Sequence, residues 1–211
     1  MQNSRNVVHI IDDDALLVET IGLIFDTIGI SHAHYNSAET FLKSFPKEAF
    51  REMSGCIVCD IRMPGIGGIA CQHILNSYDS ALPIILITGF ADVKMAVDTM
   101  RDGAFNFVEK PFRHQVLIDT VQQALSHNEN ILAQRASVHN VEVAIQRLSK
   151  RELSVLDLLV DGHPNKTIAS TLNISLRTAE VHRAHILEKM MSKNVAELVK
   201  KVMMVRQIPS V

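Results

Sequence analysis

The sequence predicts an α/β domain with a five-stranded, parallel, doubly wound sheet, followed by a smaller all-α domain. Short apolar runs rich in β-branched residues alternate with segments of helical periodicity through residues 1–125, which is typical of a parallel sheet covered by helices. The charge also changes along the chain. Residues 1–148 carry 11 Lys or Arg against 17 Asp or Glu, whereas residues 149–211 carry 10 against 6. The basic second part indicates a nucleic-acid partner.

Four of the expected strands end at a residue that can handle phosphate or a metal ion. They cover residues 7–11 before Asp12, 56–59 before Asp60, 84–87 before Thr88, and 105–109 before Lys110. Residues 32–35 are a weaker fifth candidate. Because the carboxyl ends of parallel strands lie at one edge of the sheet, the four ends are expected to meet at one site.

Helical periodicity separates these strands. The expected helices cover residues 16–28, 38–44, 69–76 and 92–101, and a fifth amphipathic helix runs from 116 to 125. Residues 126–147 are mostly polar and contain neither Pro nor Gly. They are therefore expected to form a helical linker between a first domain at 1–125 and a second at 148–211.

The second domain has the proportions of a helix-turn-helix unit. Ser149 and Glu152 have the spacing of a capping box ahead of an apolar helix. Helices over 165–172 and 175–191 follow, and residues 196–205 form a fourth helix. On the third of these helices one face belongs to the core, and the other mixes Arg177, Glu180, Val181, Ala184 and Glu188.

The composition fits an intracellular protein. The 211 residues are 47% hydrophobic, enough for a sizeable core, and no apolar run approaches the ~20 residues of a membrane helix. The first six residues lack the layout of a signal peptide. We therefore expect a cytoplasmic protein without a membrane partner. Cys56, Cys59 and Cys71 are three in number, and the first two straddle an expected strand, so free thiols are expected. Residues i and i+3 of a strand point to opposite faces, which argues against a metal or redox pair at Cys56 and Cys59.

The residues at the strand ends suit phosphoryl transfer to a carboxylate. Asp12, Asp13 and Asp60 would repel one another, and a divalent cation such as Mg²⁺ would relieve that repulsion. Thr88 offers a hydroxyl and Lys110 a compact cation for phosphate oxygens. Asp60 is the expected nucleophile because it stands alone at a central strand end.

The same segments resemble the receiver domain of bacterial response regulators over roughly residues 5–125. The resemblance is carried by Asp12-Asp13-Asp14, Cys59-Asp60-Ile61-Arg62-Met63-Pro64-Gly65, Ile87-Thr88-Gly89 and Phe107-Val108-Glu109-Lys110-Pro111-Phe112. The departure is Phe90, where many close relatives have His. That difference is expected to affect access to the site and the lifetime of the phosphorylated form.

The resemblance implies a role for each of these residues. Asp60 would accept a phosphoryl group from a phosphohistidine of a sensor histidine kinase. Thr88 and Lys110 would contact the phosphoryl oxygens, and Phe107 would be a switch aromatic or, on the simpler interpretation, a core residue. Mg²⁺ (or Mn²⁺) would be held by Asp12, Asp13, Asp60 and the backbone carbonyl of Arg62.

The basic part resembles the LuxR-type DNA-binding domain over roughly residues 145–206. The motifs are Leu148-Ser149-Lys150-Arg151-Glu152, Asn165-Lys166-Thr167-Ile168-Ala169, Asn173-Ile174-Ser175 and Arg177-Thr178-Ala179-Glu180-Val181-His182. Base reading would then belong to Glu180, Val181 and Ala184. The side chains placed to contact phosphates are Lys166, Arg177, Thr178, Arg183, Lys189 and Lys193.

With a receiver in front, the chain resembles the FixJ/NarL class of regulators. The expected function is a transcription regulator switched by phosphorylation, with no enzyme activity beyond self-phosphorylation and self-dephosphorylation. Its expected partners are a sensor histidine kinase, DNA, RNA polymerase and, once phosphorylated, a second copy. Leu198, Val199 and Val202 could supply the dimer contact or simply the core. Two alternatives stay open: a vestigial or ligand-sensing receiver, and a metal-dependent phosphatase with an Asp nucleophile.

Overall fold

A computed structural model of the chain describes residues 6–89 and 93–206. The chain divides into two compact units, Met1–Ala133 and Gln134–Val211. Asp92 and Phe90, for which the sequence suggests a helix cap and a departure from the receiver pattern, lie outside the described residues.

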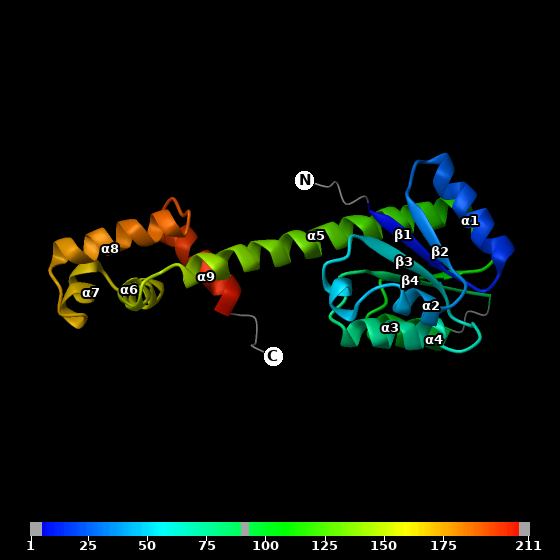
Figure 1. The fold of residues 1–211 in the computed structure, drawn as a ribbon, viewed down its shortest axis with the longest axis horizontal. Helices are drawn as coiled ribbons and strands as arrows, with labels where there is room; N and C mark the ends of the chain where they lie inside the picture. The colour runs from blue at the N-terminus through cyan, green and yellow to red at the C-terminus, as the bar shows by residue number, and fades with distance from the viewer. Residues whose placement is uncertain (1–5, 90–92, 207–211) are drawn as a thin grey trace. The chain divides into compact units, whose positions relative to one another are not determined.

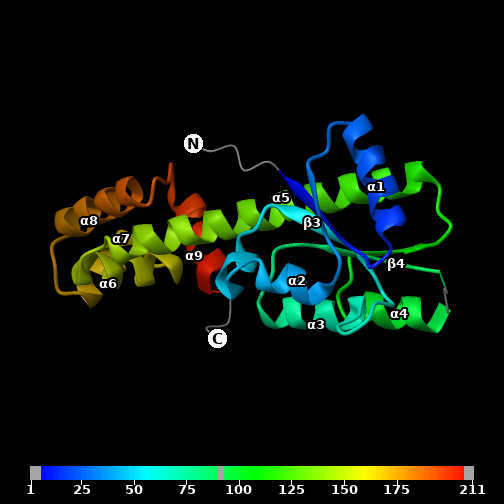
Figure 2. The ribbon, with the colours of Figure 1, turned by 45° about the vertical axis from the view of Figure 1, so that its right-hand side comes forward.

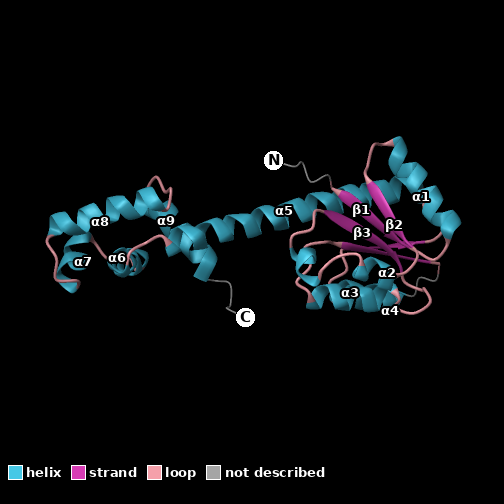
Figure 3. Cartoon of the chain, in the orientation of Figure 1, coloured by secondary structure: helices cyan, strands magenta, loops and turns pink. Residues whose placement is uncertain are grey.

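The first unit contains one parallel sheet of five strands (Figure 3). The strands are β1 (Val7–Ile11), β2 (His32–Tyr35), β3 (Gly55–Asp60), β4 (Ile84–Thr88) and β5 (Asn106–Glu109). Their order in the sheet is β2-β1-β3-β4-β5. The direction of winding therefore reverses between β1 and β3, which is where a doubly wound sheet opens a crevice at its carboxyl edge. The predicted fold class and all five predicted strands are confirmed.

Helices cover both faces of this sheet (Figures 1 and 2). They are α1 (Ala15–Thr27), α2 (Ala38–Lys43), α3 (Gly68–Ser77), α4 (Val93–Arg101) and α5 (His114–Gln146), with a short 3₁₀ helix, η1 (Lys47–Arg51), which the sequence did not predict. In the views, α2, α3 and α4 lie on one face, and α1 and the first part of α5 lie on the other.

Alternation along the strands supplies a separate core to each face. Ile57 and Cys59 of β3 pack with Phe41, Phe50 and other residues under α2 and α3. Cys56 and Val58 pack instead with residues of α1 and α5. Neighbouring strand residues thus serve opposite cores, as the period of two along a strand requires. The three cysteines are buried free thiols, as predicted.

Helix α5 continues without a break through most of the segment that was expected to be a linker. Asn128 in this segment is fully buried in the first unit. Its side-chain oxygen accepts the Gly55 N–H at 2.9 Å, and its side-chain nitrogen donates to the carbonyls of Ala81 and Met53 at 2.8 and 3.1 Å. Further along α5, Val141 and Ala144 are buried in the core of the second unit. The ends of the expected linker therefore belong to the two cores.

The second unit is helical throughout its described part. Besides the end of α5 it contains α6 (Lys150–Val160), α7 (Asn165–Thr171), α8 (Leu176–Lys189) and α9 (Val195–Arg206). The predicted capping box at the start of α6 is present: the Ser149 side chain accepts from the Glu152 backbone, and the Glu152 side chain accepts from the Ser149 backbone.

The apolar residues of the last helix belong to the core of the second unit. Leu198 and Val202 are buried there, and Val199 packs against the same core. The core interpretation of this stripe is therefore the one that the structure supports. Among the described helices of the whole chain, none combines the length and the apolar character that crossing a membrane requires.

Candidate functional site

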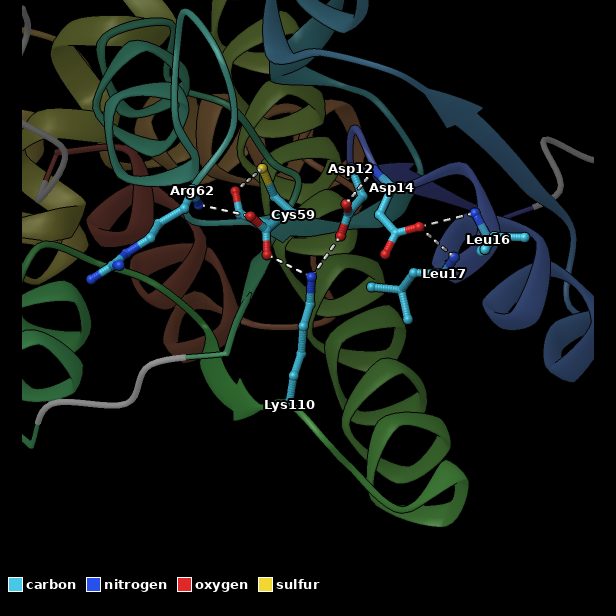
Figure 4. A network of polar contacts seen from close by, with 8 residues as sticks. Asp12, Asp14, Leu16, Leu17, Cys59, Arg62 and Lys110 are labelled. Carbon is cyan, nitrogen blue, oxygen red and sulfur yellow. Dashed lines mark hydrogen bonds and ion pairs between the residues drawn. The ribbon is translucent and has the colours of Figure 1, made fainter.

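The ends of β1, β3 and β5 place two carboxylates and one ammonium group in direct contact (Figure 4). Lys110 Nζ lies 2.9 Å from Asp12 Oδ2 and 2.7 Å from Asp60 Oδ1. Both aspartates are buried. The three residues lie at the carboxyl edge of the sheet, beside the point where the strand order reverses.

The electrostatics of this cluster follow from its burial. Removal of Asp12 from water raises the pKa of its carboxyl group, even though the Asp14 backbone N–H and Lys110 both favour its ionised form. Burial by itself would lower the pKa of Lys110, but its hydrogen bonds to Asp60 and Asp12 outweigh that effect and raise it. Lys110 is therefore held as a cation, and one positive charge is shared between two carboxylates.

Backbone groups fix the orientation of both carboxylates. Asp12 Oδ1 accepts the Asp14 N–H at 2.9 Å, and Asp60 Oδ2 accepts the Arg62 N–H at 2.8 Å. Each aspartate thus uses one oxygen to bind the chain two residues ahead and the other to bind Lys110. Such preorganised side chains suit chemistry in which charge must be placed accurately.

Thr88 is buried at the end of β4, the strand next to β3. Its backbone carbonyl accepts the Lys110 N–H at 2.7 Å, which ties the start of the segment after β5 to the end of β4. Thr88 is therefore connected to the residue that bridges the two aspartates. The hydroxyl group predicted to contact phosphate stands on the strand beside Asp60.

The groups predicted to hold a metal ion are partly assembled. Asp13 is exposed and lines, with Asp12, a hollow of about 420 Å³ whose other walls are α1 and β2. Within the described ranges no three His, Cys, Asp or Glu side chains form a ready-made metal cluster. The oxygen donors nevertheless fit Mg²⁺, which takes few protein ligands and keeps water or phosphate in its remaining positions. Three aspartates against one lysine also leave a net charge of −2 for a divalent cation to balance.

Phe107 lies opposite Leu86 in the β4–β5 register and is half-buried against the core under α2 and α3. A half-buried aromatic at this place suits both the switch role and the simpler core role. Its position is therefore compatible with both interpretations.

One contact near this site was not predicted. Glu39 at the start of α2 accepts a hydrogen bond from the Ile66 N–H, in the loop that follows Asp60. Glu39 and Ile66 are 27 residues apart, and neither belongs to a recognisable motif. The nearest signal in the sequence is the run of glycines at 65, 67 and 68, which indicates a tightly packed loop.

In the second unit, α8 presents one largely exposed face. The opposite side of the helix is buried in the core through Ala179 and Ile186. The exposed residues are Arg177, Thr178, Glu180, Val181 and Ala184. Ser175 caps the helix by accepting the Thr178 N–H at 3.0 Å. The residues predicted to read bases therefore lie together on an open surface.

Three further predicted DNA contacts differ in their surroundings. Lys166 is exposed on α7. Arg183 is half-buried and donates to Asn165 Oδ1 at 3.4 Å. Lys189 donates to both carboxylate oxygens of Glu152, at 2.8 and 2.7 Å. Lys189 thus has a structural role, because it connects α8 to α6. Its predicted contact with DNA is a separate role.

Comparison with protein families assigns both units. Residues 8–122 match the response regulator receiver domain, and residues 146–202 match the LuxR family of bacterial regulatory proteins. The chain is a LuxR-type response regulator. It is thus a two-component transcriptional regulator with a receiver domain and a DNA-binding domain, as the sequence motifs predicted.

Curated relatives of this response regulator match over almost its whole length. It is 35% identical to the transcriptional regulatory protein FixJ of Bradyrhizobium diazoefficiens over 93% of this chain and 94% of the relative. It is 37% identical to FixJ of Rhizobium meliloti over 92% and 93%. The C4-dicarboxylate transport transcriptional regulatory protein DctR of Rhodobacter capsulatus is 36% identical over 90% and 96%.

Solved structures give the same assignment for this response regulator. The response regulator StyR matches with a TM-score of 0.82 and 34% identity, over 94% of this chain and 98% of that one. Full-length FixJ from B. japonicum matches with a TM-score of 0.57 and 33% identity, over 98% and 100%.

Proposed function

We propose that phosphorylation of Asp60 switches this response regulator between two states that differ in their affinity for DNA. The observation that carries the proposal is the contact of one lysine with two buried carboxylates, Lys110 with Asp12 and Asp60, at the carboxyl edge of the sheet. This contact supports a role for Asp60 as the nucleophile, because its carboxylate stands beside a cation that can stabilise charge on a transferred phosphoryl group.

In the proposed reaction an Asp60 carboxylate oxygen attacks the phosphorus of a phosphohistidine on the sensor kinase. The new O–P bond forms as the P–N bond breaks, and the histidine leaves with the electron pair of that bond. Lys110 stabilises charge on the phosphoryl oxygens, and the Thr88 hydroxyl donates a hydrogen bond to one of them. Asp12, Asp13, Asp60 and the Arg62 carbonyl would hold Mg²⁺, which when bound supplies further charge neutralisation.

The phosphoryl group would then bias a pre-existing equilibrium. Its contact with Thr88 pulls on β4, and Phe107 on the neighbouring strand responds to that movement. The favoured state forms a dimer, and two copies of α8 bind two half-sites of DNA through Glu180, Val181 and Ala184. The bound regulator contacts RNA polymerase in the cytoplasm, where its DNA target lies.

The first test is covalent labelling of the full chain. Incubation with acetyl phosphate and Mg²⁺, followed by intact mass measurement, is expected to add one phosphoryl group to the wild-type protein. Asp60→Asn is expected to remain unlabelled. Asp119→Asn, which changes an exposed carboxylate on α5, is the matched control and is expected to be labelled like the wild type.

Three results would contradict the proposal. A wild-type protein that takes up no phosphoryl group would favour a vestigial or ligand-sensing receiver. Labelling of Asp60→Asn would show that Asp60 is not the acceptor. Continuous turnover of phosphomonoesters, lost in Asp60→Asn, would instead indicate a phosphatase.

A further inference from the structure

The loop that follows Asp60 is held by a side chain from a different part of the chain. This loop covers residues 61–67 and connects the end of β3 to the start of α3. Glu39 Oε1, from the first turn of α2, accepts the Ile66 N–H at 2.7 Å. The contact connects helix α2 directly to the segment that carries Arg62.

Gly65 and Glu39 fit each other closely. Gly65 has φ +78°, a backbone conformation that residues other than glycine rarely adopt. A Cβ atom built on Gly65 would lie 2.3 Å from Glu39 Oε1. The backbone conformation therefore favours glycine at this position, and the absence of a Cβ atom leaves room for the Glu39 carboxylate to approach the loop.

The loop is held both by its own backbone and by Glu39. At its base, the Gly68 N–H donates to the Ile61 carbonyl at 3.1 Å, and Cβ atoms at Gly67 and Gly68 would lie 2.6 and 2.5 Å from backbone oxygens of Ile61 and Asp60. Near the end of the loop, Ile66 is held from outside by Glu39. Arg62 lies between these two attachments, and its N–H bonds to Asp60 Oδ2.

The hydrogen bond from Ile66 goes to a carboxylate anion. Hydrogen bonds from the backbone N–H groups of Glu39 itself and of Ile66 lower the pKa of Glu39, and Lys43 adds to the effect. Glu39 is therefore ionised at neutral pH. A bond from a neutral N–H to an ionised acceptor is shorter and stronger than one between neutral groups.

We infer that Glu39 is a positioning residue for the metal and phosphoryl site: it fixes the loop at Ile66 so that Arg62 is presented correctly beside Asp60. The inference rests on the proposed function, because the Arg62 carbonyl matters only if it binds the metal ion. Glu39 does not touch the reacting atoms. It acts on the site as the outer partners of metal ligands do, by orienting a group that binds the metal.

Magnesium binding to the full-length protein separates this role from a merely structural one. Glu39→Ala removes the oxygen that accepts the Ile66 N–H, and Glu39→Gln keeps an oxygen at the same position of the side chain. Thr40→Ala is the control for damage to α2, because its hydroxyl bonds to Ser37 and Asn36 within the same turn. Mg²⁺ affinity is measured by titration calorimetry, and protection of the Ile66 amide by hydrogen exchange.

Glu39→Ala is expected to weaken Mg²⁺ binding by roughly tenfold, the lower end of the range for groups that orient metal ligands, and to speed exchange at Ile66. Glu39→Gln is expected to fall between Glu39→Ala and the wild type, because a neutral amide oxygen accepts a weaker hydrogen bond than a carboxylate. Thr40→Ala is expected to stay within about twofold of the wild type. Equal Mg²⁺ affinity in Glu39→Ala and Thr40→Ala would overturn the inference and leave the proposed function intact. A wild-type protein that neither binds Mg²⁺ nor is labelled by acetyl phosphate would overturn both.

Discussion

At the scale of single residues, Lys110 partly neutralises the two buried carboxylates of Asp12 and Asp60. Unlike a metal ligand, it is expected to weaken the binding of a cation at this site. Because its ammonium group occupies Asp12 Oδ2 and Asp60 Oδ1, it competes electrostatically with a bound cation. Lys110→Ala is therefore expected to bind Mg²⁺ several-fold more tightly, since unbalanced carboxylates repel each other more. The same variant is expected to be labelled more slowly, because a charge-stabilising group is removed.

Calorimetry and the rate of labelling by acetyl phosphate measure these two effects on one sample. Lys43→Ala removes an exposed lysine from the end of α2 and serves as the control. Weaker Mg²⁺ binding in Lys110→Ala would contradict the competition that the geometry indicates.

His9 on β1 predicts a pH dependence of stability. It is buried among Tyr35, Phe41 and Phe45, and its Nε2 atom has no hydrogen-bond partner among the described residues. Burial lowers its pKa from 6.5 to about 4. Below pH 6.5 the unfolded chain takes up a proton that the folded chain refuses, so stability falls between pH 6.5 and about 4 and then levels off.

The contribution of His9 to the free energy of unfolding is expected to fall by about 2.5 kcal/mol from pH 7.5 to 4.5, since each pKa unit corresponds to ~1.4 kcal/mol. Urea unfolding of the wild type and of His9→Phe at both pH values measures it. The phenylalanine keeps an aromatic ring and cannot titrate. If the difference in the free energy of unfolding between the wild type and His9→Phe does not change with pH, His9 is not buried in its neutral form.

Residues at the strand ends could be predicted from the sequence because their signal is local. An apolar run followed by Asp12, Asp60 or Lys110 shows both the strand and the place where it ends. Glu39 could not be predicted, because its partner lies 27 residues away. Its hydrogen bond depends on how helix α2 and the loop after β3 approach each other, which no local pattern encodes.

At the scale of elements, α5 shows how composition can mislead. Residues 126–147 are mostly polar, which favours a linker. Asn128 nevertheless lies fully buried and binds the start of β3 through Gly55 and the segment ahead of β4 through Ala81. From the sequence alone, a buried asparagine cannot be distinguished from one at the surface, because the partners of its hydrogen bonds come from distant parts of the chain.

Asn128→Ala is expected to destabilise the receiver domain by about 3 kcal/mol, because two buried backbone groups and one partly buried carbonyl lose their partner. Urea unfolding of the full chain measures the change. Gln123→Ala alters an exposed side chain on the same helix and is expected to change stability by less than about 0.5 kcal/mol. Equal stability of Asn128→Ala and Gln123→Ala would contradict a role for Asn128 in the core.

Glu152 and Lys189 connect α6 to α8 and predict a second dependence on pH. The hydrogen bonds from Lys189 and from the Ser149 backbone lower the pKa of Glu152 to about 2. This pKa lies below the ordinary value of 4.5 for a glutamate. The interaction therefore stabilises the folded domain above about pH 4.5, and this stabilisation is lost as the pH falls toward 2.

Lys189→Ala is expected to destabilise the DNA-binding domain by about 2 kcal/mol at pH 7, with a smaller effect near pH 3. Thermal unfolding followed by circular dichroism measures this. Lys200→Ala changes an exposed lysine on α9 and is the control. An effect of Lys189→Ala on DNA binding alone, with unchanged stability, would contradict the structural role of the pair.

At the scale of the whole molecule, the sign of the net charge changes between the first and the second part of the chain. The formal charge of residues 1–148 is −6 and that of residues 149–211 is +4. DNA binding through the basic part is expected to release counterions, so that affinity falls steeply as salt rises. Arg177 and Lys166 are exposed in the second unit and are predicted to contact phosphates.

Each of Arg177→Ala and Lys166→Ala is therefore expected to reduce the slope of log affinity against log salt by about one, because one DNA phosphate is no longer neutralised by the protein. Their effect is expected to be nearly independent of DNA sequence, whereas Glu180→Ala changes the preference among sequences because that residue is predicted to face bases. Fluorescence anisotropy with promoter and random duplexes at several salt concentrations measures both quantities. Lys200→Ala, exposed on α9, is the control. A slope unchanged in Arg177→Ala would show that α8 does not lie along the phosphate backbone.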